Sequence, residues 1–316
     1  MPLRRAGRSG ILLPAISLGL WHNFGSVDDP AEAERMLLKA FDKGICHFDL
    51  ANNYGPEPGS AEITFGRFWQ RHLRQHRDEL FISSKAGHLM WRGPYGDGSS
   101  RKNLMASIDQ SLRRTGLDYF DVFYSHRYDG VTPIEETMQA LIDIVRSGKA
   151  LYVGLSKYPA PLLREAYALL HEAHVPCLLS QYRYNLLQRE VETDILPLAS
   201  AEGSGFVAFS SLAQGLLTDK YQHGIPADSR AGRSEGFLRR EQVTADVVAT
   251  ASRLAAIARD RGQTLAEMAL AWVLRDERVT SVIIGTRHTA QLTDCLAALD
   301  HLDFTPEELA AIDAAM

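Results

Sequence analysis

Eight short apolar runs, each followed by a helix-like segment, constrain the fold of this chain more than any other feature. In each run the apolar residues are consecutive and do not alternate with polar ones, which is typical of strands that are covered on both faces. The runs are residues 15–20, 45–50, 80–84, 120–125, 150–155, 177–181, 205–210 and 280–284. Eight strand–helix units in 316 residues predict an α/β fold, a closed (β/α)8 barrel of the TIM type. An open doubly wound sheet is the alternative, and the missing GxGxxG after the first run disfavours it.

The segments between the runs carry helix start and stop signals. Pro30 follows two aspartates at the first predicted helix, and glycines such as Gly44 and Gly116 end helices. The predicted helices are residues 31–43, 60–72, 101–115, 133–147, 161–173, 189–201 (interrupted by Pro197), 243–261, 265–275, 289–299 and 306–315. An N-terminal hairpin is expected before residue 15, a long polar connection over 211–242, and extra helices at the C-terminus. We see no linker, so residues 1–316 are expected to form a single domain.

Composition excludes several classes of function. Apolar residues make up 45% of the chain, which allows a large core, and the net charge is −5. A negative charge argues against a nucleic-acid partner, because such domains carry a basic stripe. No apolar run approaches the roughly 20 residues that span a membrane, and no apolar signal core follows the N-terminus. The three cysteines form no CxxC pair, so neither a disulfide framework nor a zinc site is expected, and a cytoplasmic location is the simplest interpretation.

Chemically active side chains stand at the ends of three of the runs. Asp49 lies at the end of the second run with Tyr54 shortly after it, Lys85 follows the third run and His126 follows the fourth. The carboxyl ends of barrel strands share one face, so we expect these four side chains to meet. A phenol titrates near pH ~10. A nearby lysine would lower its pKa, and an aspartate would hold the charge of that lysine.

Each of the four residues also has an ordinary structural interpretation. Asp49 could cap a strand end, Tyr54 could be a loop aromatic, and His126 could lie on the rim beside Arg127. Lys85 is harder to explain in this way, because burying an ammonium without a partner is costly. The four together, in this order, favour a catalytic group.

This set of residues in its strand context resembles the aldo-keto reductase family. The resemblance covers nearly the whole chain. Within the family, the chain is similar to the bacterial L-glyceraldehyde 3-phosphate reductases, which form the branch related to potassium-channel β subunits. It is carried by Gly19-Leu20-Trp21-His22-Asn23-Phe24-Gly25, His47-Phe48-Asp49, Ala51-Asn52-Asn53-Tyr54-Gly55-Pro56, Ser84-Lys85, Met90-Trp91, Gly93-Pro94-Tyr95-Gly96, Gly154-Leu155-Ser156, Ser180-Gln181-Tyr182, Leu212-Ala213-Gln214-Gly215-Leu216-Leu217-Thr218 and Val282-Ile283-Ile284-Gly285.

The resemblance implies reduction of a small aldehyde by NADPH, with L-glyceraldehyde 3-phosphate and methylglyoxal as candidate substrates. Tyr54 would protonate the carbonyl oxygen as general acid, with its pKa lowered by Lys85. Asp49 would hold Lys85, and His126 would donate a hydrogen bond that polarises the carbonyl. The family also implies a homo-oligomer, a tetramer or larger.

The resemblance assigns the cofactor to three groups of residues. The nicotinamide end would lie on Trp21, Asp49, Ser156, Lys157, Gln181 and Phe209; the pyrophosphate on Ser210, Ser211, Leu212, Gln214, Lys220 and Arg230; and the adenosine end on Gly285, Thr286, Arg287, Gln291, Asp294 and Cys295. Many relatives have Asn at position 157, and Glu and Asn are more frequent at 294 and 295. Arg287 at a helix start suits the extra phosphate of NADP, although it could also be a solvated surface charge.

The substrate would be held by residues of two loops and by the catalytic residues Tyr54 and His126. These are Trp21, His22, Tyr54, Trp91, Tyr95 and His126, with Tyr128 nearby. Long loops at the catalytic face usually shape the pocket, and the 86–100 loop is one. For a substrate phosphate the sequence leaves Arg92, Arg127 and Lys102 open.

Two other functions remain in consideration. A nucleotide-sensing partner protein, like the channel β subunits, would tolerate loss of the hydrogen-bond donor at position 126, whereas a reductase should keep it, and His126 is present. A metal-dependent hydrolase on the same barrel would need clustered ligands at several strand ends. The strand ends offer no HxH motif, so no metal site is predicted.

Overall fold

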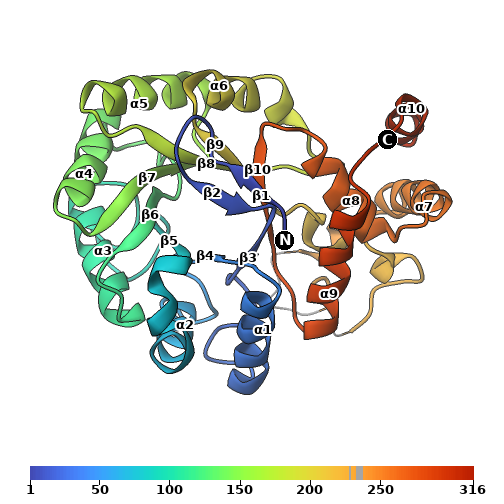
Figure 1. The fold of residues 1–316 in the computed structure, drawn as a ribbon, viewed down its shortest axis with the longest axis horizontal. Coiled ribbons are helices and arrows are strands. Elements are labelled where there is room, and N and C mark those ends of the chain that lie inside the picture. The colour runs from blue at the N-terminus through green and yellow to red at the C-terminus, as the bar shows by residue number, and fades with distance from the viewer. Residues whose placement is uncertain (228, 233–237) are drawn as a thin grey trace.

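Eight parallel strands close into a barrel in the computed structural model, which describes residues 1–227, 229–232 and 238–316. The strands are β3 (Ile16–Gly19), β4 (His47–Asp49), β5 (Phe81–Ala86), β6 (Phe120–Ser125), β7 (Ala150–Ser156), β8 (Cys177–Arg183), β9 (Gly205–Phe209) and β10 (Val279–Ile284). They follow one another in chain order around the barrel, and β10 pairs with β3 to close it (Figure 1). Each predicted run is therefore a strand, and the predicted (β/α)8 barrel is confirmed.

Helices surround the barrel in Figure 1 and bury their apolar faces against it. They are α1 (Pro30–Asp42), α2 (Ser60–Phe68), α3 (Arg101–Thr115), α4 (Ile134–Arg146), α5 (Ala160–Glu172), α6 (Ile195–Glu202), α7 (Ala245–Asp260), α8 (Leu265–Leu274), α9 (Thr289–Ala297) and α10 (Pro306–Ala314). Side-chain caps fix several starts: Asp29 accepts from the Ala31 amide, and Ser100 accepts from the Asn103 amide. The C-terminal helix α10 packs mainly on α7, outside the ring.

Two predicted helices differ from the observed ones. The segment expected over 189–201 begins with a single 3-10 turn, Glu190–Glu192, and the α-helix starts only at Ile195. Pro197 then lies in the first turn, where its missing N–H would have had no helical partner. The helix predicted over 60–72 leaves α geometry after Phe68 and continues as a π turn over Trp69–Leu73.

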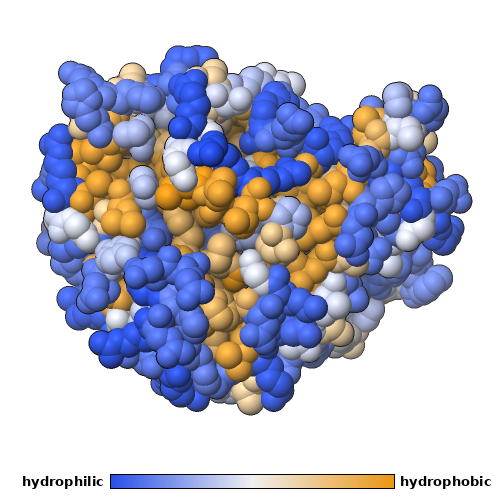
Figure 2. Space-filling view, viewed as in Figure 1, coloured by the Kyte–Doolittle hydropathy of each residue, from blue (hydrophilic) through white to orange (hydrophobic). Residues whose placement is uncertain are grey.

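The predicted N-terminal hairpin is present and covers one end of the barrel. Its strands are β1 (Leu3–Arg5) and β2 (Leu12–Pro14), and the Arg4 guanidinium donates to the carbonyls of Val279 at 2.9 Å and Leu274 at 2.7 Å. Val279 begins β10, so the hairpin lies at the N-terminal ends of the strands. Figure 2 shows this face, with apolar side chains around the hairpin and polar helices at the periphery. The opposite end, where the strands finish, stays available for chemistry.

The connection predicted over 211–242 is largely irregular, and residues 228 and 233–237 of it lie outside the described residues. Its described part contains short 3-10 turns at Ala213–Gly215, Asp219–Tyr221 and Arg240–Gln242. Across the residues that the structure describes, no helix combines the length and the apolar character needed to cross a bilayer.

Candidate active site

The four predicted catalytic residues converge at the C-terminal end of the barrel. Asp49 ends β4, Lys85 lies near the end of β5, and His126 directly follows β6. Parallel pairing sets Asp49 opposite Ser83, and Lys85 opposite Tyr124. Tyr54 returns to these strand ends from the loop after β4, because that loop closes on itself in a tight turn, with the Tyr54 amide donating to the Ala51 carbonyl.

Lys85 is the centre of this group. Its side chain is fully buried, and its ammonium donates to Asp49 Oδ2 at 2.6 Å, to the Leu50 carbonyl at 2.6 Å and to the Tyr54 hydroxyl at 3.4 Å. An ammonium has three protons and no acceptor, so these contacts use its full donor capacity. The Tyr54 oxygen accepts from Lys85, which leaves the phenolic proton of Tyr54 for another acceptor.

The second oxygen of Asp49 is also held. Ser83 donates to Asp49 Oδ1 at 2.7 Å, and Gln181 donates to the same atom at 3.1 Å. Ser83 was not in the predicted site, yet it lies two residues before Lys85 on one strand, and period-two alternation points both side chains into the barrel. Gln181 was predicted for the cofactor, and in this structure its amide fixes the carboxylate that balances Lys85.

The predicted lowering of the pKa of Tyr54 by Lys85 is wrong for this structure. Although the ring keeps partial access to solvent, the burial of the phenol and the carboxylate of Asp49 raise the pKa of Tyr54 well above its ordinary value. Asp49 offsets the charge of Lys85, so desolvation decides the direction. Tyr54 is therefore protonated at neutral pH, which is the state that a general acid needs.

His126 completes the group as a neutral imidazole. It is buried, its ring lies edge-on to Tyr54 with 5.8 Å between centroids, and burial lowers its pKa well below the ordinary value, assisted by the charges of Lys157 and Lys85. Its Nδ1 atom is buried without a hydrogen-bond partner in the described part of the chain. A neutral imidazole carries one N–H donor, which can face a carbonyl oxygen.

The segment after β9 has the features of a ligand cradle. Ser210 and Gln214 adopt positive φ values of 55° and 59°, a strained conformation that persists where the surroundings require it. The Ser211 hydroxyl and the Gln214 carbonyl oxygen are buried without a partner among the described residues. Orphaned buried polar atoms call for a ligand or water, so these two predicted pyrophosphate residues fit a polar cofactor.

Arg230 brings the predicted cofactor residues of two distant segments together. Its guanidinium lies 3.6 Å from the position that a Cβ atom would take at Gly285, in the loop after β10. Burial of His22, assisted by the charge of Arg230, lowers the pKa of His22 to about 4. The Arg287 amide donates to Gln291 Oε1 at 2.9 Å at the start of α9, and the preceding residue, Thr286, is buried.

Other predicted cofactor residues have varied surroundings. The Ser156 hydroxyl donates to the Gln181 carbonyl at 2.8 Å, and Phe209 ends β9, followed by the half-buried Leu212. Lys220 and Asp294 are exposed. Cys295 is packed in the core, and burial raises its pKa to about 12, so this side chain is an uncharged thiol within the helix packing.

The predicted substrate residues separate into two groups. Trp21 lies near both His22 and Tyr54, with ring centroids 4.2 and 6.3 Å apart, so these three are part of the centre. Tyr95 is not: its side chain is 53% exposed, and Lys102 lies 5.0 Å from its ring. Trp91 is half-buried in the same loop, which closes by a hydrogen bond from the Met90 amide to the Gly96 carbonyl.

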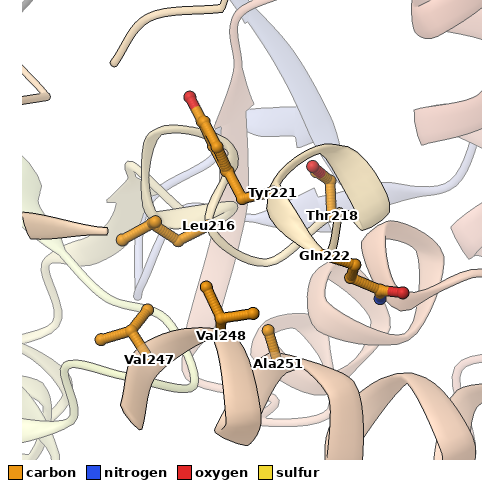
Figure 3. A pocket seen from close by; sticks show the side chains of 7 residues that line it. All are labelled: Leu216, Thr218, Tyr221, Gln222, Val247, Val248 and Ala251. Atoms are coloured by element: carbon orange, nitrogen blue, oxygen red, sulfur yellow. The ribbon is translucent and has the colours of Figure 1, made fainter. Parts of the chain in front are cut away.

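A narrow apolar crevice lies between the 216–222 segment and α7 (Figure 3). It is lined by Leu216, Thr218, Tyr221, Gln222, Val247, Val248 and Ala251. None of the predicted catalytic residues contributes to it, so this crevice is a packing seam of the connection rather than the site of chemistry. Among the described residues, no group of three or more His, Cys, Asp or Glu side chains could hold a metal ion.

Comparison with known proteins agrees with this geometry. The model of the aldo/keto reductase family matches residues 15–316. The chain belongs to the aldo/keto reductase family. Membership makes it an oxidoreductase that acts on carbonyl groups, and members of the family use nicotinamide cofactors.

Four individual relatives carry two kinds of description. The chain is 52% identical to the L-glyceraldehyde 3-phosphate reductase of Escherichia coli O157:H7 and 51% identical to that of strain K12, each over 99% of this chain and 92% of the relative. It is 36% identical to a probable voltage-gated potassium channel subunit beta of Oryza sativa subsp. japonica, over 99% of this chain and 96% of the relative. A protein of the same description from Arabidopsis thaliana is 37% identical, over 95% and 92%.

Proposed function

We propose that this enzyme reduces small aldehydes with NADPH, with L-glyceraldehyde 3-phosphate and methylglyoxal as its first candidate substrates. The observation that carries the proposal is the contact from Lys85 to the Tyr54 hydroxyl at 3.4 Å, which leaves a proton-bearing phenol at the barrel mouth. The name of the relatives that are 51–52% identical supports the choice of the first aldehyde.

In the proposed reaction the bound cofactor supplies a hydride to the carbonyl carbon, and the protein manages the oxygen. Tyr54 gives its proton to the carbonyl oxygen, and the resulting phenolate lies beside the ammonium of Lys85. Asp49 keeps Lys85 charged and in place. His126 donates a hydrogen bond that orients the carbonyl and stabilises the negative charge that develops on its oxygen.

We assign the pyrophosphate and the adenosine end of the cofactor to the residues that the sequence names for them. The unsatisfied Ser211 hydroxyl after β9 and the Arg230 guanidinium beside Gly285 support binding of the pyrophosphate, while the unsatisfied Gln214 Oε1, an acceptor, can receive a hydrogen bond from a cofactor hydroxyl. The preference for NADPH over NADH rests on Arg287 at the start of α9, where a helix N-terminus and a guanidinium both favour a phosphate. To test this preference, the affinities of the Arg287→Ala variant for NADPH and for NADH are measured by nucleotide fluorescence. Only the affinity for NADPH should fall.

The experiment that tests the reaction measures NADPH oxidation with glyceraldehyde 3-phosphate and with methylglyoxal, for the wild type and for Tyr54→Phe. The substitution removes only the phenolic hydroxyl. We expect kcat to fall by at least about 100-fold, since general acid catalysis contributes about that much, while NADPH still binds. Turnover that persists in Tyr54→Phe would contradict the role of this residue.

The second candidate function is a nucleotide-binding partner protein with slow turnover, similar to the channel β subunits. The 36–37% identity to two such proteins over nearly the full chain favours it. Against it stands His126, buried 5.8 Å from the Tyr54 ring as a neutral donor. Tight NADPH binding with negligible turnover of every aldehyde would select this alternative.

We further propose that the enzyme is a homo-oligomer, a tetramer or larger, in the cytoplasm. The three cysteines support a reducing compartment, since none forms a disulfide. Sedimentation velocity of the purified enzyme at micromolar concentration tests the assembly. A single species with the mass of one chain would contradict it.

A further inference from the structure

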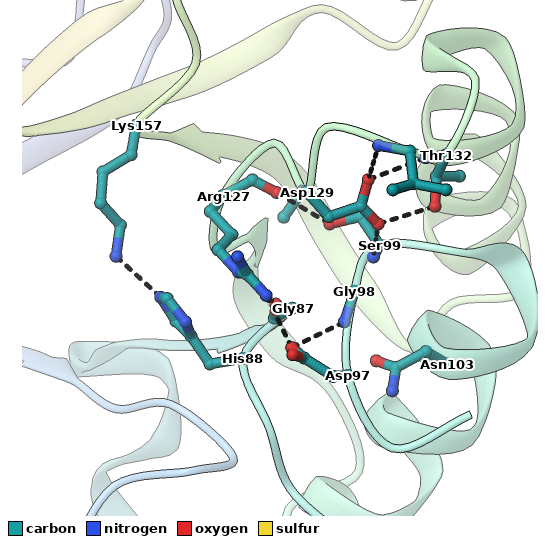
Figure 4. A network of polar contacts seen from close by, with 12 residues as sticks. Gly87, His88, Asp97, Gly98, Ser99, Asn103, Arg127, Asp129, Thr132 and Lys157 are labelled. Carbon is teal, nitrogen blue, oxygen red and sulfur yellow. Dashed lines mark hydrogen bonds and ion pairs between the residues drawn. The ribbon is translucent and has the colours of Figure 1, made fainter. Parts of the chain in front are cut away.

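Lys157 is bound to a histidine of the neighbouring loop. The ammonium of Lys157, directly after β7, lies 2.9 Å from Nε2 of His88, which follows β5 (Figure 4). Lys157 adopts a positive φ of 59°, and its side chain reaches across the barrel mouth while remaining exposed. Since an ammonium can only donate, Nε2 of His88 is the acceptor, and His88 is neutral. Burial, assisted by the charge of Lys157, lowers the pKa of His88 to about 4, which agrees with this state.

The histidine connects Lys157 to the catalytic centre. The ring of His88 lies edge-on to His126, with 4.5 Å between centroids. His126 in turn lies edge-on to Tyr54. His88 is thus the side chain that separates the Lys157 ammonium from His126, the residue proposed to donate a hydrogen bond to the carbonyl oxygen.

The charge of Lys157 is not neutralised by the protein. Within the described part of the chain, neither Lys157 nor Arg183 forms an ion pair with an acid, and both lie 5.9 Å from the ring centroid of Phe209. Arg127, the third cation here, is held by the Gly87 carbonyl at 2.9 Å and by Asp97 at 2.8 Å (Figure 4). In a chain of net charge −5, this edge of the active site is locally positive.

The donor count of Lys157 also points to a ligand. Its only hydrogen bond among the described residues goes to His88, so two of the three ammonium protons are left for solvent or a bound group. Hydrogen bonds from an ammonium to a phosphate or carboxylate are charge-assisted and about twice as strong as neutral ones.

We infer that Lys157, positioned by His88, is a specificity-determining residue that binds the anionic group of the substrate. The enzyme would accordingly prefer small aldehydes that carry a phosphate or a carboxylate over uncharged aldehydes with the same carbonyl. This inference rests on the proposed reductase function and deepens it. It also gives Lys157 a role toward the substrate in place of the predicted contact with the nicotinamide, because its hydrogen bond goes to the 86–100 loop.

The test compares glyceraldehyde 3-phosphate with glyceraldehyde at saturating NADPH. The readout is the ratio of the two kcat/KM values, for the wild type, Lys157→Met and Lys157→Arg. A hydrogen bond to a charged group is worth enough for the ratio to fall about 10- to 100-fold in Lys157→Met. Lys157→Arg, which keeps the charge, should retain most of the preference. Succinic semialdehyde against butanal extends the comparison to a carboxylate.

One further lysine serves as a matched control, and another tests a rival site. Lys43→Met removes the same charge from an exposed position at the end of α1, and the ratio should not change. Lys102→Met tests the rival anion site beside Tyr95. If Lys102→Met abolishes the phosphate preference and Lys157→Met does not, the inference is overturned.

An independent measurement uses inorganic phosphate alone. At saturating NADPH, phosphate should inhibit glyceraldehyde reduction by the wild type competitively with the aldehyde, and this inhibition should weaken about 10-fold or more in Lys157→Met. A change in NADPH affinity without a change in the substrate ratio would overturn the inference and return Lys157 to the cofactor. Failure of the proposed function is distinguishable, because the wild type would then reduce neither aldehyde.

Discussion

His47 and Ser83 are joined inside the barrel, with 3.1 Å between the imidazole Nε2 and the hydroxyl oxygen. The same hydroxyl donates to Asp49 at 2.7 Å, and the other nitrogen of His47 lies 2.8 Å from the Ser17 hydroxyl. A buried polar chain therefore supports the carboxylate that holds Lys85. Such a chain is stabilising only while each member keeps its partners.

The first prediction concerns the acid stability of this chain of contacts. Burial lowers the pKa of His47 from 6.5 to about 4. The unfolded state thus binds the proton more readily, so the contribution of His47 to stability is complete above pH 6.5 and is lost as the pH falls through about 4. The full effect is about 3 kcal/mol. Measured by urea unfolding, the free energy of unfolding should differ less between pH 7.5 and pH 5 for His47→Gln than for the wild type. His301→Gln, at an exposed position, should leave the difference unchanged.

A second prediction concerns the buried pair of Lys85 and Asp49. Lys85→Met leaves the Asp49 carboxylate buried without its cation, which should cost about 3–5 kcal/mol in the free energy of unfolding. Adding Asp49→Asn removes the stranded charge, so the double variant should be more stable than Lys85→Met alone. Urea midpoints of the three variants measure this. A double variant whose loss equals the sum of the single losses would show that the two residues are not coupled.

The third prediction concerns close packing beside the site. Gly154 on β7 pairs with Tyr124 on β6, and a Cβ atom at Gly154 would lie 2.3 Å from the Tyr124 ring. The centroid of that ring lies 5.5 Å from Lys85 Nζ. Gly154→Ala must displace this ring and should cost about 1–3 kcal/mol, seen as a lower Tm. Gly10→Ala is the matched control, since nothing lies within 4 Å of its Cβ position.

The fourth prediction concerns the pH dependence of the phosphate preference. Although the Lys157 side chain keeps access to solvent, desolvation of its ammonium by the surrounding protein and the charges of Lys85, Arg127 and Arg183 lower its pKa to about 8, and His88 beside it is neutral. The ammonium is present below that pH and is lost above it, so the kcat/KM ratio of phosphorylated to unphosphorylated glyceraldehyde should decline as the pH rises through about 8. A ratio that stays constant from pH 7 to about 9.5 would contradict a role for this charge, given that phosphate keeps its full charge there.

Local sequence patterns determined the architecture. The apolar runs mark the strands because a strand that is covered on both faces needs apolar side chains at successive positions. Glycines and capping residues such as Asp29 mark helix ends because they satisfy or terminate backbone hydrogen bonds locally. Barrel topology then carries Asp49, Lys85 and His126 to one end, so the meeting of these side chains followed from strand order alone.

The tertiary structure decided what depends on the sum of all neighbours. The contact between His88 and Lys157 joins two residues that no sequence periodicity connects. It exists because barrel closure brings two loops together. The raised pKa of Tyr54 depends on its burial and on the nearby carboxylate of Asp49. The late start of α6 depends on where Pro197 falls relative to the first turn. Hydrogen-bonding patterns and hydrophobic periods are local, whereas side-chain direction and desolvation are properties of the packed whole.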